Sequence, residues 1–164
     1  YDPPVPDLVL IDDYLYLASI DTGLRIFDIS EPSQPVEVET GQEIAGEHLA
    51  VGNGYAYVTA KGLQILDISD PASPVMVGAT EVGLFGVRWS IRGIAVDDNY
   101  AYLIDDIVGL RVIDISNPTR PVEVGYSPVP GTPADLAITS DHIWVATTAS
   151  GLFPFRLTPV DDKS

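Results

Sequence analysis

The chain has 164 residues, enough for one domain of ordinary size, and 46% of them are hydrophobic, so it can bury a substantial core. Eight Lys and Arg stand against 24 Asp and Glu, and the resulting net charge of −16 disfavours nucleic acid and anionic membranes as partners. Because the chain has no cysteine, disulfides, thiolate metal ligands and a cysteine nucleophile are excluded.

The first residue and the hydropathy of the chain suggest how it is processed. The first residue is Tyr1, and no charged and apolar leader follows it. No run approaches the ~18 apolar residues that a transmembrane helix needs. We therefore expect a processed chain, or a part of a longer one, that does not itself insert into a membrane.

A pattern of short apolar segments recurs four times along the chain. Each unit opens with an apolar segment, continues with two rings one residue apart, and then has a Gly-Leu pair. The opening segments are residues 8–11, 49–51, 94–96 and 136–138, and the ring pairs are Tyr14/Tyr16, Tyr55/Tyr57, Tyr100/Tyr102 and His142/Trp144. The Gly-Leu pairs start at Gly23, Gly62, Gly109 and Gly151, which lie 39, 47 and 42 residues apart. A period near 40 with short β-rich runs is typical of a β-propeller.

Each unit is predicted to form four strands, in the order apolar segment, aromatic run, Gly-Leu run and a last strand after a Pro-x-x-Pro turn. The last strands are expected at residues 36–39, 75–79 and 122–126, and the fourth unit ends before its own. Asp, Asn and Gly fill the turns between first and second strands, because they tolerate positive φ. No helical periodicity persists, so the chain is predicted to be all-β, a single propeller segment (1–164) with units 7–47, 48–92, 93–134 and 135–164.

The strands are apolar on both faces, as residues 55–58 (Tyr-Ala-Tyr-Val) illustrate. A sheet with one wet face would alternate apolar and polar residues. Sheets that stack face to face around an axis bury both faces, so this pattern favours propeller blades over a sandwich.

The third segment of each unit carries a family resemblance. It reads GLRIFDISEPSQP from Gly23, GLQILDISDPASP from Gly62 and GLRVIDISNPTRP from Gly109. These runs, with the Tyr-Ala-Tyr-Val lead-in, resemble the LVIVD-repeat family. The resemblance implies a β-propeller and a bacterial or archaeal cell-surface protein, and it brings no shared catalytic motif.

The number of blades leaves three arrangements open. In the first arrangement, the chain is the C-terminal part of a longer propeller whose other blades lie upstream or on another chain. In the second, it is half of a head-to-tail dimer of about eight blades, and in the third it is a four-bladed monomer. Any open arrangement exposes sheet edges and an apolar blade face, which promotes association with a protein partner or with itself. The mass in solution distinguishes the three.

The residues just before each opening segment are predicted to surround one mouth of the axis. They are Asp7, His48, Gly93 and Asp135, with Glu47 and Arg92 as neighbours. Such a ring of acidic, imidazole and glycine positions is suited to a cation or a polar ligand; the alternative is a set of solvated channel residues. A glycosidase-type pair of Asp7 and Asp135 is a further, weaker alternative.

The longest connection between units holds a second candidate site. Residues 81–90 include Phe85, Arg88 and Trp89, of which Trp and Arg are enriched at binding hot spots. The alternative is that Phe85 and Trp89 pack on the next blade. Replacing Arg88 and Trp89 by Ala is expected to leave folding intact while weakening binding.

Recurrent aspartates and acidic pairs are expected to be structural. Asp28, Asp67 and Asp114 recur at one position, where each is predicted to accept hydrogen bonds from the backbone of the following Ser-x-Pro turn. The acidic clusters at 12–13, 97–99, 105–106 and 161–162 suggest calcium, but none has EF-hand spacing and two occupy hairpin turns. The three tyrosine pairs are expected to pack between blades.

Function is expected to lie in the loops of a scaffold. No nucleophile elbow, P-loop or dinucleotide-binding motif is present, so we expect neither a catalytic residue, a metal site nor a cofactor. The sequence favours a non-enzymatic extracellular or cell-surface interaction module. The alternatives are part of a hydrolase or oxidoreductase whose other blades are absent, or a structural subunit of a surface assembly.

Overall fold

The computed structural model describes residues 7–38, 44, 46–60, 62–71, 73–81 and 91–157. These residues form strands and turns without a helix, as the spacing predicts. The first sheet contains β1 (Asp7–Ile11), β2 (Tyr14–Ser19), β3 (Gly23–Asp28) and β4 (Val36–Val38). The second contains β5 (His48–Gly52), β6 (Tyr55–Thr59), β7 (Gly62–Asp67) and β8 (Val75–Glu81). The third contains β9 (Ile91–Val96), β10 (Tyr100–Asp105), β11 (Gly109–Asp114) and β12 (Val122–Ser127), and the last contains β13 (Pro133–Ile138), β14 (His142–Thr147) and β15 (Gly151–Arg156).

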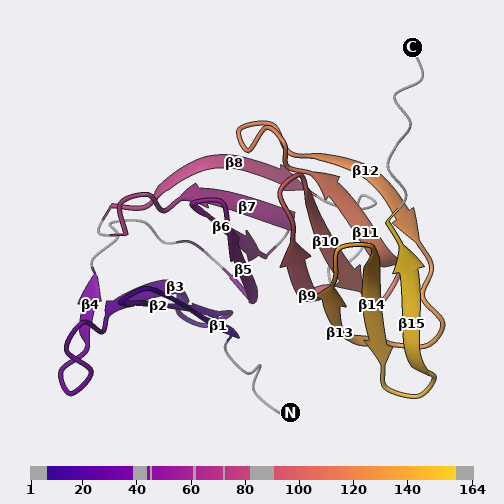
Figure 1. Cartoon of the computed structure of the whole chain (residues 1–164), viewed down its shortest axis with the longest axis horizontal. Helices are drawn as coiled ribbons and strands as arrows, with labels where there is room; N and C mark the ends of the chain where they lie inside the picture. Colours follow the sequence, from indigo (N-terminus) through magenta and orange to yellow (C-terminus); the bar gives the residue numbers. More distant parts are fainter. Residues whose placement is uncertain are drawn as a thin grey trace.

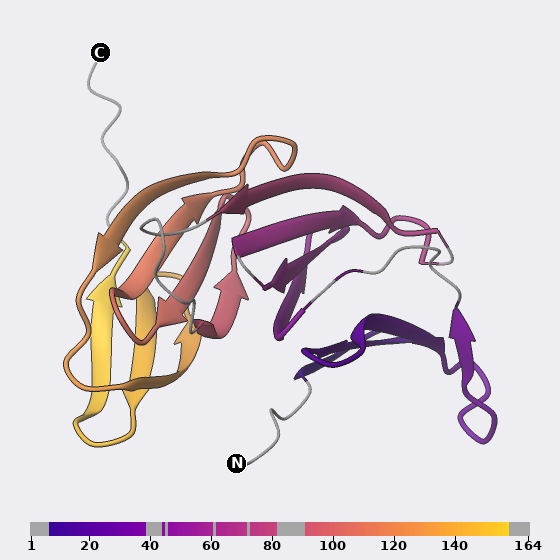
Figure 2. The ribbon, with the colours of Figure 1, turned by 180° about the vertical axis from the view of Figure 1, so that it is seen from behind.

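Every sheet is an antiparallel meander in chain order, which confirms the predicted blade pattern. The sheets follow one another along an open arc, with the first sheet at one end and the last at the other (Figure 1). The opening strands β1, β5, β9 and β13 lie toward the inside of the arc, and the view from behind shows the same order (Figure 2). The arrangement is that of propeller blades, and the fold class predicted from the sequence is confirmed.

Local sequence chemistry explains the hairpins. Asp12 and Asn53 adopt positive φ angles of 49° and 54° in the turns after β1 and β5, as expected of Asp and Asn there. The recurrent aspartates behave as predicted: an Oδ1 atom of each accepts a hydrogen bond of 2.9 Å from a serine backbone N–H two residues on. The pairs are Asp28–Ser30, Asp67–Ser69 and Asp114–Ser116. The turns after β3, β7 and β11 are thereby each fixed by their own aspartate.

Three apolar clusters join the four sheets in sequence. In each cluster the second ring of the aromatic pair, Tyr16, Tyr57 or Tyr102, is buried against the following sheet. We call the face of a sheet that packs on the following sheet its forward face, and the opposite face its rear face. Burial of one large apolar side chain stabilises the fold by about 1.5–3 kcal/mol, so these contacts dominate cohesion between sheets. The predicted packing role is confirmed for the three tyrosine pairs.

The last sheet has three strands among the residues that the structure describes, so β15 is its outermost strand there. The same residues include no helix long and apolar enough to cross a bilayer.

Candidate functional site at the mouth of the axis

The inner strands bring most of the predicted mouth residues together. Asp7, His48, Gly93 and Asp135 line one hollow of about 350 Å³, together with Arg92 and two apolar neighbours. Each comes from a different sheet, because these positions coincide when the repeats are aligned. The sequence prediction that one end of the axis gathers these side chains therefore matches their placement.

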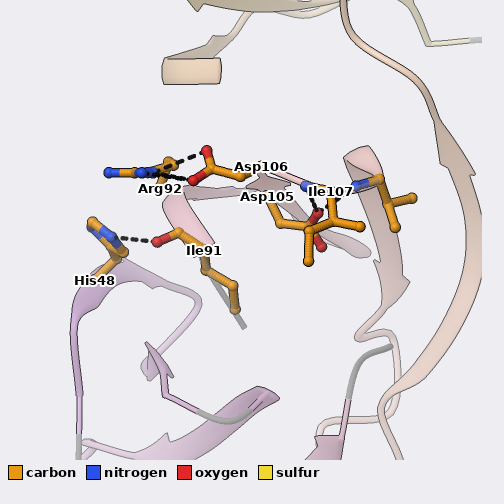
Figure 3. A network of polar contacts seen from close by, with 7 residues as sticks. His48, Ile91, Arg92, Asp105, Asp106 and Ile107 are labelled. Atoms are coloured by element: carbon orange, nitrogen blue, oxygen red, sulfur yellow. Dashed lines mark hydrogen bonds and ion pairs between the residues drawn. The ribbon is translucent and has the colours of Figure 1, made fainter. Parts of the chain in front are cut away.

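Asp7 and His48 brace neighbouring inner strands. The Asp7 carboxylate accepts a hydrogen bond from the backbone N–H of Leu8 in its own strand and from that of Leu49 in β5, both at 2.9 Å. His48 Nε2 lies 3.0 Å from the backbone oxygen of Ile91, at the start of β9 (Figure 3). A carbonyl oxygen only accepts, so Nε2 carries the proton in this contact. Both side chains thus reach from one sheet to the backbone of the next.

Arg92 leaves the line of its strand at a β-bulge. In the pairing of β9 with β10, Gly93 lies opposite Ile104 and Ile91 opposite Asp105, which leaves Arg92 as the extra residue. Its guanidinium binds Asp106 in the β10–β11 turn, with Nε and Nη2 donating to the carboxylate at 3.0 and 2.6 Å (Figure 3). This hydrogen bonding raises the pKa of Arg92 above its ordinary value.

Gly93 and Asp135 complete the hollow on the far side. A Cβ at Gly93 would lie 2.9 Å from Leu136 Cδ2, so the glycine allows β13 to approach closely. Asp135 is exposed, and its Oδ1 accepts a hydrogen bond of 2.8 Å from the Leu136 backbone N–H. Of the two carboxylates at the mouth, Asp135 makes fewer backbone contacts and is more open to a ligand.

The charge at this mouth is predominantly negative. Arg92 is neutralised by Asp106, and Glu47 also acts on it electrostatically. Asp7 and Asp135 add two carboxylates that no cation pairs with among the residues the structure describes. The hollow is therefore suited electrostatically to a cationic group.

Two of the acidic clusters considered for calcium have a carboxylate that is engaged in a turn. Asp97 accepts hydrogen bonds from two backbone N–H groups in its turn and from the Tyr102 hydroxyl. Asp105 caps the following turn through Ile107 and Val108. Within the described parts of the chain, no group of three or more His, Cys, Asp or Glu is placed to hold a metal ion. Residues 161–162 lie outside the described residues.

The second predicted site, with Phe85, Arg88 and Trp89, also lies outside the described residues. What sequence reasoning missed is the bulge and the pairing of Arg92 with Asp106. The sequence feature that could have indicated the bulge is the glycine that follows the arginine at the start of β9. This feature is weak, because a bulge depends on how two strands pair.

Comparison with solved structures gives the fold. The periplasmic gluconolactonase PpgL of Pseudomonas aeruginosa matches 93% of this chain with a TM-score of 0.76 at 13% identity, over 50% of its own length. BamB of Moraxella catarrhalis matches 92% with a TM-score of 0.64 at 10% identity, over 42% of its length. The computationally designed Ika4 protein matches 96% with a TM-score of 0.69 at 12% identity, over 94% of its length. The chain thus spans half or less of the two natural propellers.

The family follows from the repeats themselves. No curated protein matches the chain. The model of the LVIVD repeat matches it three times, at residues 5–41, 46–82 and 90–127, which together make up more than half of its length. These three segments coincide with the first three sheets. The chain belongs to the LVIVD repeat family.

Proposed function

We propose that this chain is a non-enzymatic binding module of the cell surface or extracellular space, and that the axial mouth holds a cationic segment of a protein partner. The observation that carries the proposal is the convergence of Asp7, His48, Arg92 and Asp135 from four sheets on one hollow. The recurrent aspartates serve turns and the tyrosine pairs serve packing, whereas the mouth positions differ in chemistry from one repeat to the next.

The bonding at the mouth supports binding over catalysis. General acid–base catalysis needs a titrating side chain free to meet substrate. Here three of the four side chains are held: Asp7 by two backbone N–H groups, His48 by the Ile91 carbonyl, and Arg92 by Asp106. Such side chains present a fixed electrostatic surface. The location is proposed from the resemblance of the repeats to those of cell-surface proteins.

The proposal is tested with two labelled peptides, hexalysine and hexaglutamate, titrated into the chain and followed by fluorescence anisotropy. Hexalysine is expected to bind and hexaglutamate to fail. Asp135→Asn is expected to weaken hexalysine binding by about two- to fivefold, the effect of one exposed charge pair.

Asp141→Asn is the matched control. It removes the same charge from the same sheet, at the turn between β13 and β14, outside the hollow. An equal loss from Asp135→Asn and Asp141→Asn would show that the peptide senses the total charge of the chain, and the proposed site would be wrong. Tight binding of hexaglutamate would also contradict it.

A further inference from the structure

The three contacts between consecutive sheets are built alike. Where the second sheet packs on the first, its rear face contributes Leu49, Val51, Ala56, Val58 and Leu66. The equivalent rear-face residues of the third sheet pack on the second, and those of the last sheet pack on the third: Ile94, Val96, Ala101, Leu103 and Ile113, then Leu136, Ile138, Ile143, Val145 and Phe155. In all three contacts, therefore, a rear face packs on the forward face of the preceding sheet.

The rear face of the first sheet has the same composition and lies at the open end of the arc. Its residues at these positions are Leu8, Leu10, Leu15, Leu17 and Phe27, and the strand register places them on one face. Leu8 and Leu10 are 53% and 59% exposed, whereas the equivalent Leu49 is 4% exposed. An apolar surface of this kind, rimmed by charge, is typical of an interaction site.

An arginine–glutamate pair strengthens the equivalence. On the first rear face, Arg25 stacks on Phe27 and binds Glu37 at 2.6 Å, and its side chain is 37% exposed. The third sheet has an equivalent pair, Arg111 with Glu123 at 2.8 Å, and there the arginine, which also binds Asp105, has a side chain that is only 7% exposed. The pair on the first sheet is therefore of a kind that this fold buries between blades.

The other end of the arc presents the complementary surface. On the forward face of the last sheet, Trp144 stands where Tyr16, Tyr57 and Tyr102 are buried in the other sheets. Leu152 is 59% exposed, whereas Leu110 at the same position in the third sheet is 2% exposed. Among the residues that the structure describes, nothing fills the rear face of the first sheet or the forward face of the last sheet.

We propose that a second copy of this chain fills both faces, with the last sheet of each copy packed on the first sheet of the other, so that two copies complete one propeller ring. The contact is head-to-tail and closes after two copies. The comparisons support this: the chain superposes on 50% of the length of PpgL and 42% of that of BamB, so about two such chains match the length of either protein. The inference rests on the fold and not on the ligand proposed for the axial mouth.

The test is the mass of the 164-residue chain by light scattering after size exclusion. The expected value is twice the 17.6 kDa of one chain. A monomer would show that the two faces are left open or covered by another protein, and a larger series of masses would show a contact that does not close. Either result overturns the proposal, and neither bears on hexalysine binding at the mouth.

Two variants test which faces meet. Leu10→Asp on the rear face and Trp144→Asp on the forward face are each expected to halve the mass. A one-to-one mixture of the two variants is expected to restore a mass of two chains, because one of its two interfaces joins two unaltered faces. A contact between two rear faces would be blocked by Leu10→Asp alone and not restored by mixing.

Ile107→Asp is the matched control. Ile107 is 58% exposed, close to the 59% of Leu10, but it lies in the β10–β11 turn away from both faces. This variant is expected to keep the mass of two chains, and a loss of mass in it would mean that apolar exposure in general drives association. Circular dichroism checks that each variant is folded; if Leu10→Asp is not, Leu8→Asp replaces it.

Discussion

At the scale of single residues, the aspartates that end β3 and β7 link the repeat to acid stability. Asp28 and Asp67 each accept a hydrogen bond from a serine backbone N–H two residues on. This hydrogen bond lowers the pKa of both carboxyls below the ordinary value. A carboxylate whose pKa is lower in the folded state stabilises the fold when it is ionised.

The pH dependence of stability follows from this sign. The contribution is complete above the pKa of Asp in the unfolded chain, about 3.9, and is lost as the pH falls through the lower folded values. In the double variant Asp28→Asn/Asp67→Asn, the amide oxygen still accepts the hydrogen bond but does not titrate. We expect the thermal midpoint of the variant to fall less than that of the parent between pH 5 and pH 3, measured by circular dichroism. Parallel curves for the two proteins would contradict this role.

At the scale of elements, β8 shows how closely one sheet approaches the next. A Cβ at Gly78 would lie 2.0 Å from the backbone oxygen of Pro118, in the turn that precedes β12. The atoms that this Cβ would meet belong to the backbone of Pro118 and Thr119, so no flexible side chain could move away. The glycine is therefore required by the passage of β8 against the third sheet.

Gly78→Ala is expected to destabilise the fold by about 1–3 kcal/mol, the usual cost of overpacking. The matched control is Gly125→Ala, because Gly125 pairs with Val112 in β11 as Gly78 pairs with Ile65 in β7. A Cβ at Gly125 would meet nothing within 4 Å, so this variant is expected to be neutral or slightly stabilising. Urea denaturation of both variants measures the difference, and equal stability would contradict the close approach of β8.

The sequence was sufficient for what depends on local pattern. The fourth strands predicted at 36–39, 75–79 and 122–126 are found at Val36–Val38, Val75–Glu81 and Val122–Ser127. The repeat also placed Asp7, His48, Gly93 and Asp135 at one end of the axis. These features follow from spacing within one unit.

The features that the sequence did not predict depend on contacts between units. The hydrogen bond from the Leu49 backbone N–H to Asp7 joins residues 42 positions apart, and the contact between His48 and Ile91 joins residues 43 apart. The bulge at Arg92 depends on the register of β9 with β10. Such details are set by how sheets stack, which periodicity alone does not specify.

The sequence of the edge strand β15 disfavours association of the last sheet with a further strand at this edge. The backbone N–H of Leu157 donates a hydrogen bond to the backbone oxygen of Asp141, in the turn that precedes β14. Because hydrogen-bonded residues alternate along an antiparallel pair, the backbone N–H and C=O groups of residues 155, 153 and 151 also point toward β14. The backbone groups of residues 152, 154 and 156 therefore point away from β14, and Pro154 among these residues has no backbone N–H to donate. A proline at such an edge position disfavours the addition of another strand. Association through the sheet face is thus favoured over association through this edge.

At the scale of the whole molecule, the net charge of −16 opposes both folding and pairing. Like charges repel one another in the compact state, and two such chains in one ring bring their charges closer still. Salt screens this repulsion, because the Debye length falls from about 10 Å at 0.1 M to about 3 Å at 1 M. The exposed Arg25–Glu37 and Arg92–Asp106 pairs lose some attraction under the same conditions, but exposed pairs contribute little.

We therefore expect added NaCl at pH 7 to raise the thermal midpoint and to lower the dissociation constant of the two-copy ring, measured by calorimetry and by sedimentation. The control is the same titration near pH 4.1, where the net charge is close to zero. There the effect of salt is expected to shrink, since little repulsion remains to be screened. An equal gain at both pH values would assign the effect to strengthened apolar burial, and a loss of stability at pH 7 would mean that the ion pairs outweigh the repulsion.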